Sequence, residues 1–132
     1  MTEIALPVTS LLAGALAVWL LVLSWAVIQV RQGAGVSLGD GGDLRLQRRT
    51  RAQGNLVEYA PLFLILLALA ELQGAAGWLL SLLALVFLAA RLAHGYAFAF
   101  TSGWPLGRMA GTGLTFASLA VAAATVLGAA LF

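Results

Sequence analysis

The chain has 132 residues, of which 62% are hydrophobic and only 9% are charged. Soluble domains carry about 25% charged residues, so this composition excludes an ordinary soluble domain and indicates a membrane protein. The chain has no cysteine, which excludes disulfides, cysteine nucleophiles and cysteine metal sites. Its net charge is only +2, so we expect no nucleic-acid partner and instead contacts with membrane lipids.

The first apolar segment is predicted to be a transmembrane helix at about residues 4–31. It has no charged residue between Ala5 and Gln29, and it is too long, and lacks the basic leader, to be a cleaved signal peptide. The glycine-rich residues 32–43 follow it and are predicted to be a flexible connection. They lack the glycine spacing of a nucleotide-binding loop.

The second helix is predicted at about residues 44–73, and it changes from basic and polar to apolar without a break. At about 100° per residue, one face carries polar groups down into the apolar half. These residues are Arg51, Asn55, Glu58 and Tyr59. Polar groups at such depth are expensive to bury, which makes them candidates for function.

A structural alternative treats the start of this helix as an interfacial segment whose arginines bind lipid headgroups. That alternative explains Arg45, Arg48 and Arg49. It does not explain Asn55 or Glu58, because an amide and a carboxylate are poor ligands for anionic headgroups.

The third helix is predicted at about residues 76–100 and carries Arg91 and His94 one turn apart. A buried arginine needs a partner, and Glu58 is the acid on the inward face of the second helix. We therefore expect an ion pair between Glu58 and Arg91. His94 is either a histidine satisfied within the bundle or one at the membrane interface. A metal site is not expected, because the chain has one histidine and no cysteine.

The fourth helix is predicted at about residues 108–132, beginning at Arg108. It is rich in small residues, which allow membrane helices to approach closely within one protomer or between protomers. The whole chain is therefore predicted to be a single domain, residues 1–132, with an all-α fold of four transmembrane helices.

The distribution of arginines predicts the orientation in the membrane. The first and third connections and their flanks carry the arginines, so both are expected to be cytoplasmic, with both termini on the other side. The polar groups of all four helices then meet in the cytoplasmic half. Guanidinium groups bind carboxylates well, so this arrangement suits an anionic, partly polar ligand beside a lipophilic one.

The second helix also resembles the R-x-x-x-N-x-x-E-x-x-P signature of the MAPEG family, the membrane-associated proteins in eicosanoid and glutathione metabolism. The matching residues are Arg51, Asn55, Glu58 and Pro61. The Gln-Val-Arg sequence that ends at Arg31 and the residues from Ala90 to His94 fit the same family. The resemblance covers the whole chain, which looks more like the small bacterial branch than the eukaryotic enzymes.

The resemblance implies a homotrimer in the bacterial inner membrane that binds glutathione, as a co-substrate, in a cleft between subunits. By position, the implied glutathione contacts are Arg31, Arg51, Gln53, Asn55, Glu58, Tyr59 and His94. Gln53 corresponds to a contact from the neighbouring protomer. Arg108 corresponds to the catalytic group, because a guanidinium beside the sulfur favours the nucleophilic thiolate.

The activity implied by the resemblance is that of a glutathione transferase or peroxidase acting on lipophilic electrophiles or hydroperoxides. An alternative is a non-catalytic protein that binds a lipid or another anionic ligand in the same cleft. Phe98 stands where several members of the family carry tyrosine, and this favours the alternative. A third interpretation is a structural or small-transporter bundle in which Glu58 and Arg91 form only an ion pair.

Overall fold

The computed structural model describes residues 5–132, and within them the chain forms four long helices joined by three short connections. The helices are α1 (Pro7–Ala34), α2 (Leu44–Leu72), α3 (Gly77–Ala99) and α4 (Pro105–Leu131). All four are long and apolar enough to cross a membrane. The predicted all-α architecture of four transmembrane helices is therefore confirmed.

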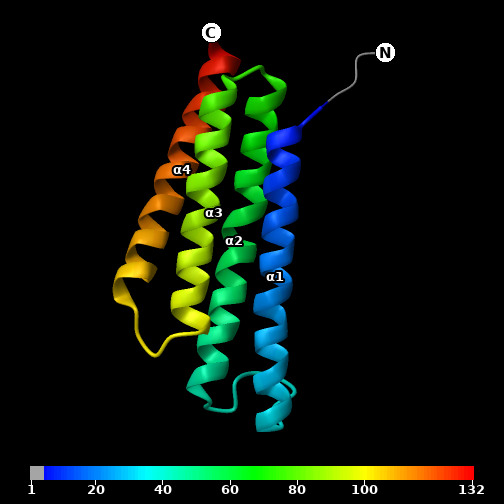
Figure 1. Ribbon diagram of the computed structural model, residues 1–132, viewed down its shortest axis with the longest axis vertical. Helices are drawn as coiled ribbons and strands as arrows, with labels where there is room; N and C mark the ends of the chain where they lie inside the picture. Colours follow the sequence, from blue (N-terminus) through cyan, green and yellow to red (C-terminus); the bar gives the residue numbers. More distant parts are fainter. Residues whose placement is uncertain (1–4) are drawn as a thin grey trace.

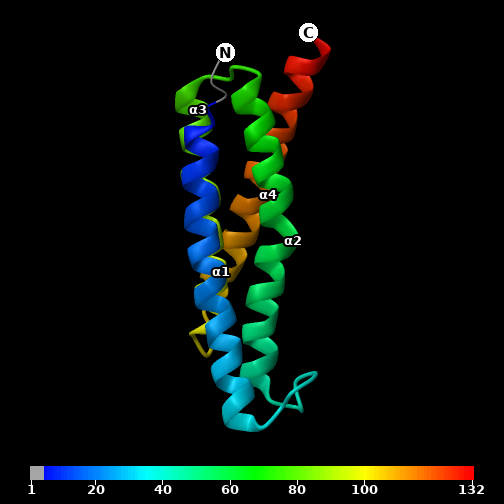
Figure 2. The same cartoon turned by 90° about the vertical axis from the view of Figure 1, so that its right-hand side faces the viewer.

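The two middle helices hold the bundle together. Both α2 and α3 pack against all the other helices, whereas α1 and α4 do not touch each other within the described residues. Figure 1 shows α1 and α4 on the outer sides, with α2 and α3 between them. The α1–α2 and α3–α4 connections lie at one end of the bundle, and the α2–α3 turn and the C-terminus lie at the other (Figures 1 and 2).

Two helix ends differ from the sequence-based expectation. The predicted start of the first helix at residue 4 lies outside the described residues. Its end is about one turn later than expected, because the chain leaves α1 only at Gly35, whose φ of 66° is easy for glycine. α4 begins at Pro105 and not at Arg108, since proline suits the first turn of a helix. Arg108 is therefore in the first turn of α4.

An aromatic stack sets α2 against α3. The rings of Phe63 and Phe87 lie parallel with their centroids 3.8 Å apart, and both side chains are fully buried. Phe63 lies one turn after Tyr59 on α2, and Phe87 lies one turn before Arg91 on α3. The stack therefore brings the polar segment of α2 to the level of Arg91.

The small residues of α4 form one stripe that faces the bundle. Its buried members are Gly107, Gly111, Thr115, Ser118 and Ala122. A Cβ atom on Gly111 would lie 2.8 Å from the carbonyl oxygen of Ala90 and 2.8 Å from Cβ of His94. The small residues thus serve close packing within the protomer, one of the two roles that the sequence predicts.

At the opposite end from the arginines, Glu71 of α2 caps the start of α1. Its carboxylate accepts hydrogen bonds from the backbone N–H groups of Val8 and Thr9, each at 3.0 Å, and from Oγ1 of Thr9 at 2.7 Å. The first N–H groups of a helix have no intrahelical partner, and α1 has no side-chain cap of its own. Glu71 therefore fixes the first turn of α1 to the last turn of α2.

We expect Glu71→Ala to lower the free energy of unfolding by about 1–3 kcal/mol, because two partly buried N–H groups and a hydroxyl lose their acceptor. The measurement is denaturant or thermal unfolding of the purified protein in detergent. Gln73→Ala is the matched control, since Gln73 is exposed just past the end of the same helix. Equal stability of the two variants would contradict the capping role.

Candidate functional site

The basic end of the bundle extends beyond the apolar layer of a bilayer. The 29 residues of α2 give a helix about 44 Å long, whereas the hydrocarbon core of a membrane is about 30 Å thick. The later part of α2 is apolar and the first part is polar, so the first part of the helix is the part that extends beyond the hydrocarbon core. The arginines at this end can therefore contact both water and protein groups.

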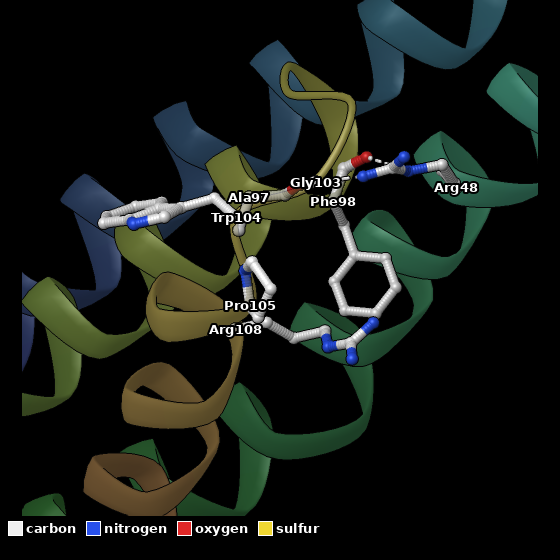
Figure 3. Close-up of a pocket in the computed structure, with 7 residues that line it drawn as sticks. All are labelled: Arg48, Ala97, Phe98, Gly103, Trp104, Pro105 and Arg108. Carbon is white, nitrogen blue, oxygen red and sulfur yellow. Dashed lines mark hydrogen bonds between the residues drawn. The ribbon is translucent and has the colours of Figure 1, made fainter.

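Arg48 of α2 binds the end of α3. Its guanidinium donates to the carbonyl oxygens of Ala97 at 3.2 Å, Phe98 at 3.3 Å and Ser102 at 2.7 Å, and Figure 3 shows it reaching across to the end of α3. The last carbonyl groups of a helix lack intrahelical donors and lie at its negative end. Arg48 therefore satisfies the C-terminus of α3.

Arg49 has a similar role, while Arg45 is exposed. Arg49 donates to the carbonyl oxygen of Ala99 at 3.3 Å and to that of Ala26 in α1 at 2.8 Å. Arg48 and Arg49 therefore both bind backbone carbonyl groups of other helices, a role that the headgroup interpretation did not include. Arg45 instead pairs with Asp43, the N-cap of α2, at 3.0 Å. The hydrogen bond from the Arg45 guanidinium holds the pKa of Asp43 below its ordinary value.

Glu58 has a different partner from the one that the sequence suggested. Arg51, two turns earlier on the same face of α2, donates NH1 and NH2 to the two carboxylate oxygens at 3.0 and 3.3 Å. The Glu58–Arg91 ion pair does not form in this structure. The physical reason is solvation: both side chains of the observed pair are about half exposed, so Glu58 pairs without giving up its contact with water.

Arg91 is buried between α2 and α4, and only 2% of its surface is exposed. NH1 donates to Oδ1 of Asn55 at 2.6 Å, and NH2 has a long contact of 3.5 Å with the carbonyl oxygen of Gly111. The guanidinium also lies 5.7 Å from the centre of the Tyr59 ring. Asn55 and Tyr59, two of the implied ligand contacts, thus meet at Arg91.

His94 and Arg108 lie together in a groove between α3 and α4, and His94 is one turn along α3 from Arg91. His94 is only 5% exposed, and its ring lies 4.9 Å from that of Phe98. The guanidinium of Arg108 lies 5.5 Å from the centre of the Phe98 ring, and Figure 3 shows the Arg108 side chain extending beside that ring. These three side chains line an open groove of about 470 Å³, together with Met109, Thr112 and Gly113.

The sequence analysis considered Phe98 only as a position that lacks the hydroxyl group of tyrosine. In the structure its ring contacts both polar residues of this groove, His94 and Arg108. An arginine over an aromatic face is held by a cation–π attraction of about 0.5–1 kcal/mol at an exposed site. The signal was available in the chain, since Phe98 lies one turn after His94 and ten residues before Arg108. This spacing does not predict the path of the α3–α4 connection, which brings Arg108 back to the Phe98 ring.

The remaining predicted contacts lie toward α1. Gln53 donates to Oγ of Ser24 at 2.8 Å, so in one chain it faces α1 and not Arg91. Arg31 donates to the carbonyl oxygen of Gly39 at 2.7 Å and lines, with Arg51, an open groove of about 540 Å³. A single chain therefore divides the predicted site residues between this groove, the buried Arg91 cluster and the α3–α4 groove.

Comparisons with known proteins agree with the architecture. The family model described as "MAPEG family" matches residues 9–128 of this chain. The chain is 38% identical over 91 residues to the inner membrane protein YecN of Escherichia coli strain K12, covering 69% of this chain and 70% of that protein. YecN of Escherichia coli O6:H1, strain CFT073, gives the same values.

Proposed function

This chain belongs to the MAPEG family and is a multi-pass protein of the bacterial inner membrane, and from that premise we propose that it is a glutathione-dependent transferase or peroxidase. Its second substrate is a lipophilic electrophile or hydroperoxide that arrives from the bilayer. The basic end of the bundle faces the cytoplasm, where the water-soluble thiol enters.

The observation that carries this proposal is the exposed pair of Arg51 and Glu58. An exposed ion pair contributes only about 0–1 kcal/mol, so a ligand can separate it at little cost. Glutathione has two carboxylates and an ammonium group. The Arg51 fork then binds a carboxylate of the ligand, and Glu58 binds its ammonium group.

Arg108 supplies the chemistry in this proposal. It lies in the first turn of α4, where the positive end of the helix dipole adds to its own charge. Beside the sulfur, this charge favours the thiolate. The thiolate forms a C–S bond to an electrophilic carbon as the leaving group departs. With a hydroperoxide it takes one oxygen and releases an alcohol, and a second glutathione then gives the disulfide and water.

The division of the site within one chain supports assembly as a homotrimer. Arg31 and Arg51 line a different groove from His94 and Arg108, so among the described residues of a single chain the four side chains do not share one groove. A neighbouring subunit that places one groove against the other would complete the site. The mass of the detergent-solubilised particle, corrected for bound detergent, tests this assembly.

One observation favours a second candidate, a non-catalytic protein that binds a lipid or another anionic ligand in the same cleft. Phe98 has no hydroxyl group to donate to a thiolate, so the groove around Arg108 offers the sulfur fewer polar contacts.

The experiment that separates the two candidates is turnover. The purified protein is incubated with glutathione and a panel of lipophilic electrophiles and hydroperoxides, and thiol consumption and products are followed by mass spectrometry. Saturable, thiol-dependent product formation is expected, and Arg45→Ala serves as a matched arginine control. Stabilisation by glutathione with no turnover on any substrate would leave the binding protein as the better conclusion.

A further inference from the structure

Arg91 is a buried cation whose charge no acid neutralises among residues 5–132. Neither ion pair of the described residues includes it, and its Nε atom has no hydrogen-bond partner there. A buried charge is expensive unless it is paired. The fold nevertheless places an uncharged amide, Asn55, at 2.6 Å from the guanidinium.

The Arg91 contact fixes which way the Asn55 amide points. A guanidinium has only donors, so the Asn55 atom that it contacts must be the oxygen. The amide nitrogen of Asn55 must then point away from Arg91. Within residues 5–132 the structure gives that nitrogen no acceptor, although the side chain is partly exposed. Asn55 therefore presents two N–H donors on the polar face of α2, one turn from both Arg51 and Glu58.

We propose that Arg91 is a positioning residue that holds Asn55 as an obligate donor and supplies the charge that selects an acidic acceptor on the ligand. This inference rests on the ligand site proposed above, though not on catalysis. Arg51 and Glu58 cancel each other's charge, so Arg91 is the uncompensated charge of this cluster. The matching ligand group is a carboxylate that accepts from the Asn55 amide.

The choice of asparagine over aspartate at position 55 follows from this role. Aspartate would give Arg91 the carboxylate partner that it lacks and would strengthen the α2–α3 contact. It would also remove both donors and repel an acidic ligand. The chain thus gives up a buried ion pair and keeps a donor for the ligand.

The test compares wild type, Asn55→Asp and Asn55→Ala in detergent, with thermal unfolding and glutathione calorimetry on each. Asn55→Asp is expected to unfold at or above the wild-type temperature, yet to bind glutathione at least about tenfold more weakly, as expected for loss of a hydrogen bond to a charged group. Asn55→Ala is expected to lose both stability and affinity. Gln73→Glu, which adds a negative charge at the far end of α2, controls for net charge and should match wild type in glutathione affinity.

Two results would overturn the inference. One is wild-type affinity in Asn55→Asp, since the amide would then not be the donor. The other is destabilisation of Asn55→Asp as large as that of Asn55→Ala, since Arg91 would then gain nothing from a carboxylate. If wild type itself does not bind glutathione, the proposed function fails. The unfolding temperatures of wild type, Asn55→Asp and Asn55→Ala would still show whether Arg91 gains a partner when position 55 carries a carboxylate.

A second variant separates the charge of Arg91 from its hydrogen bond. Arg91→Gln keeps an N–H donor for Asn55 and removes the positive charge. We expect weaker glutathione binding from this variant, and a smaller difference in affinity between asparagine and aspartate at position 55. If asparagine and aspartate at position 55 differed in glutathione affinity as much with Arg91→Gln as with Arg91, the charge of Arg91 would not select the ligand.

Discussion

Arg108→Ala is expected to lower kcat by about 100-fold or more while glutathione still binds, which is the scale seen when one preorganised charge-stabilising donor is removed from an active site. Arg108 lies in the α3–α4 groove with its guanidinium against Phe98, and its side chain is exposed. Its removal therefore leaves no buried group unpaired and should change the stability of the fold very little.

The measurement is kcat together with the dissociation constant of glutathione and the pH–rate profile. Without the guanidinium, the thiolate forms only at higher pH, so the rising limb of the profile should move upward in pH. Arg45→Ala, which removes an exposed arginine paired with Asp43 at the same end of the bundle, should leave all three quantities unchanged. An unaltered kcat, or affinity lost in proportion to kcat, would show that Arg108 does not act on the sulfur.

Gly111→Leu is expected to prevent α4 from docking onto α3. Even the first added atom would lie 2.8 Å from a backbone carbonyl oxygen and 3.1 Å from the backbone nitrogen of His94. Backbone atoms cannot turn aside as a flexible side chain can. Overpacking of a well-packed interior typically costs about 1–3 kcal/mol, which is our expectation for Gly111→Ala. Leucine adds three more carbons and should cost more.

The effect of these substitutions is read from thermal unfolding in detergent and from the yield of monodisperse protein. Gly128→Ala is the control on the same helix, because a Cβ atom there meets nothing within 4 Å, and alanine is the better helix former. Gly128→Ala should be neutral or slightly stabilising. Wild-type stability in Gly111→Leu would mean that α3 and α4 do not pack as closely as described.

The four helices and the polar face of α2 were predictable because both depend on local patterns. Each apolar run is continuous, and each connection contains glycine or proline. The spacing of Asn55 and Tyr59 placed them on one face regardless of what they contact, and both do meet Arg91. The family motif named the same positions by resemblance.

The partners of the charged groups were not predictable from these patterns. Whether Glu58 pairs with Arg51 or Arg91 depends on how α3 is rotated and how deep it lies against α2, and helical periodicity specifies neither. Two signals could have been used. The N-cap residue of α1 is Leu6, whose side chain cannot accept a hydrogen bond, and at the end of α3 Thr101 donates to one carbonyl oxygen, that of Ala97. Charged groups of α2 supply further partners at both places, Glu71 at the first and Arg48 at the second.

The most direct test of the proposed site is glutathione binding to wild type and Arg51→Ala, measured side by side by calorimetry and thermal shift. Because Arg51 and Glu58 form an exposed pair, Arg51→Ala should unfold within about 1 kcal/mol of wild type, so a loss of binding cannot come from misfolding. We predict that glutathione stabilises wild type and Arg45→Ala but not Arg51→Ala. No response in wild type, or an equal response in Arg51→Ala, would contradict the account.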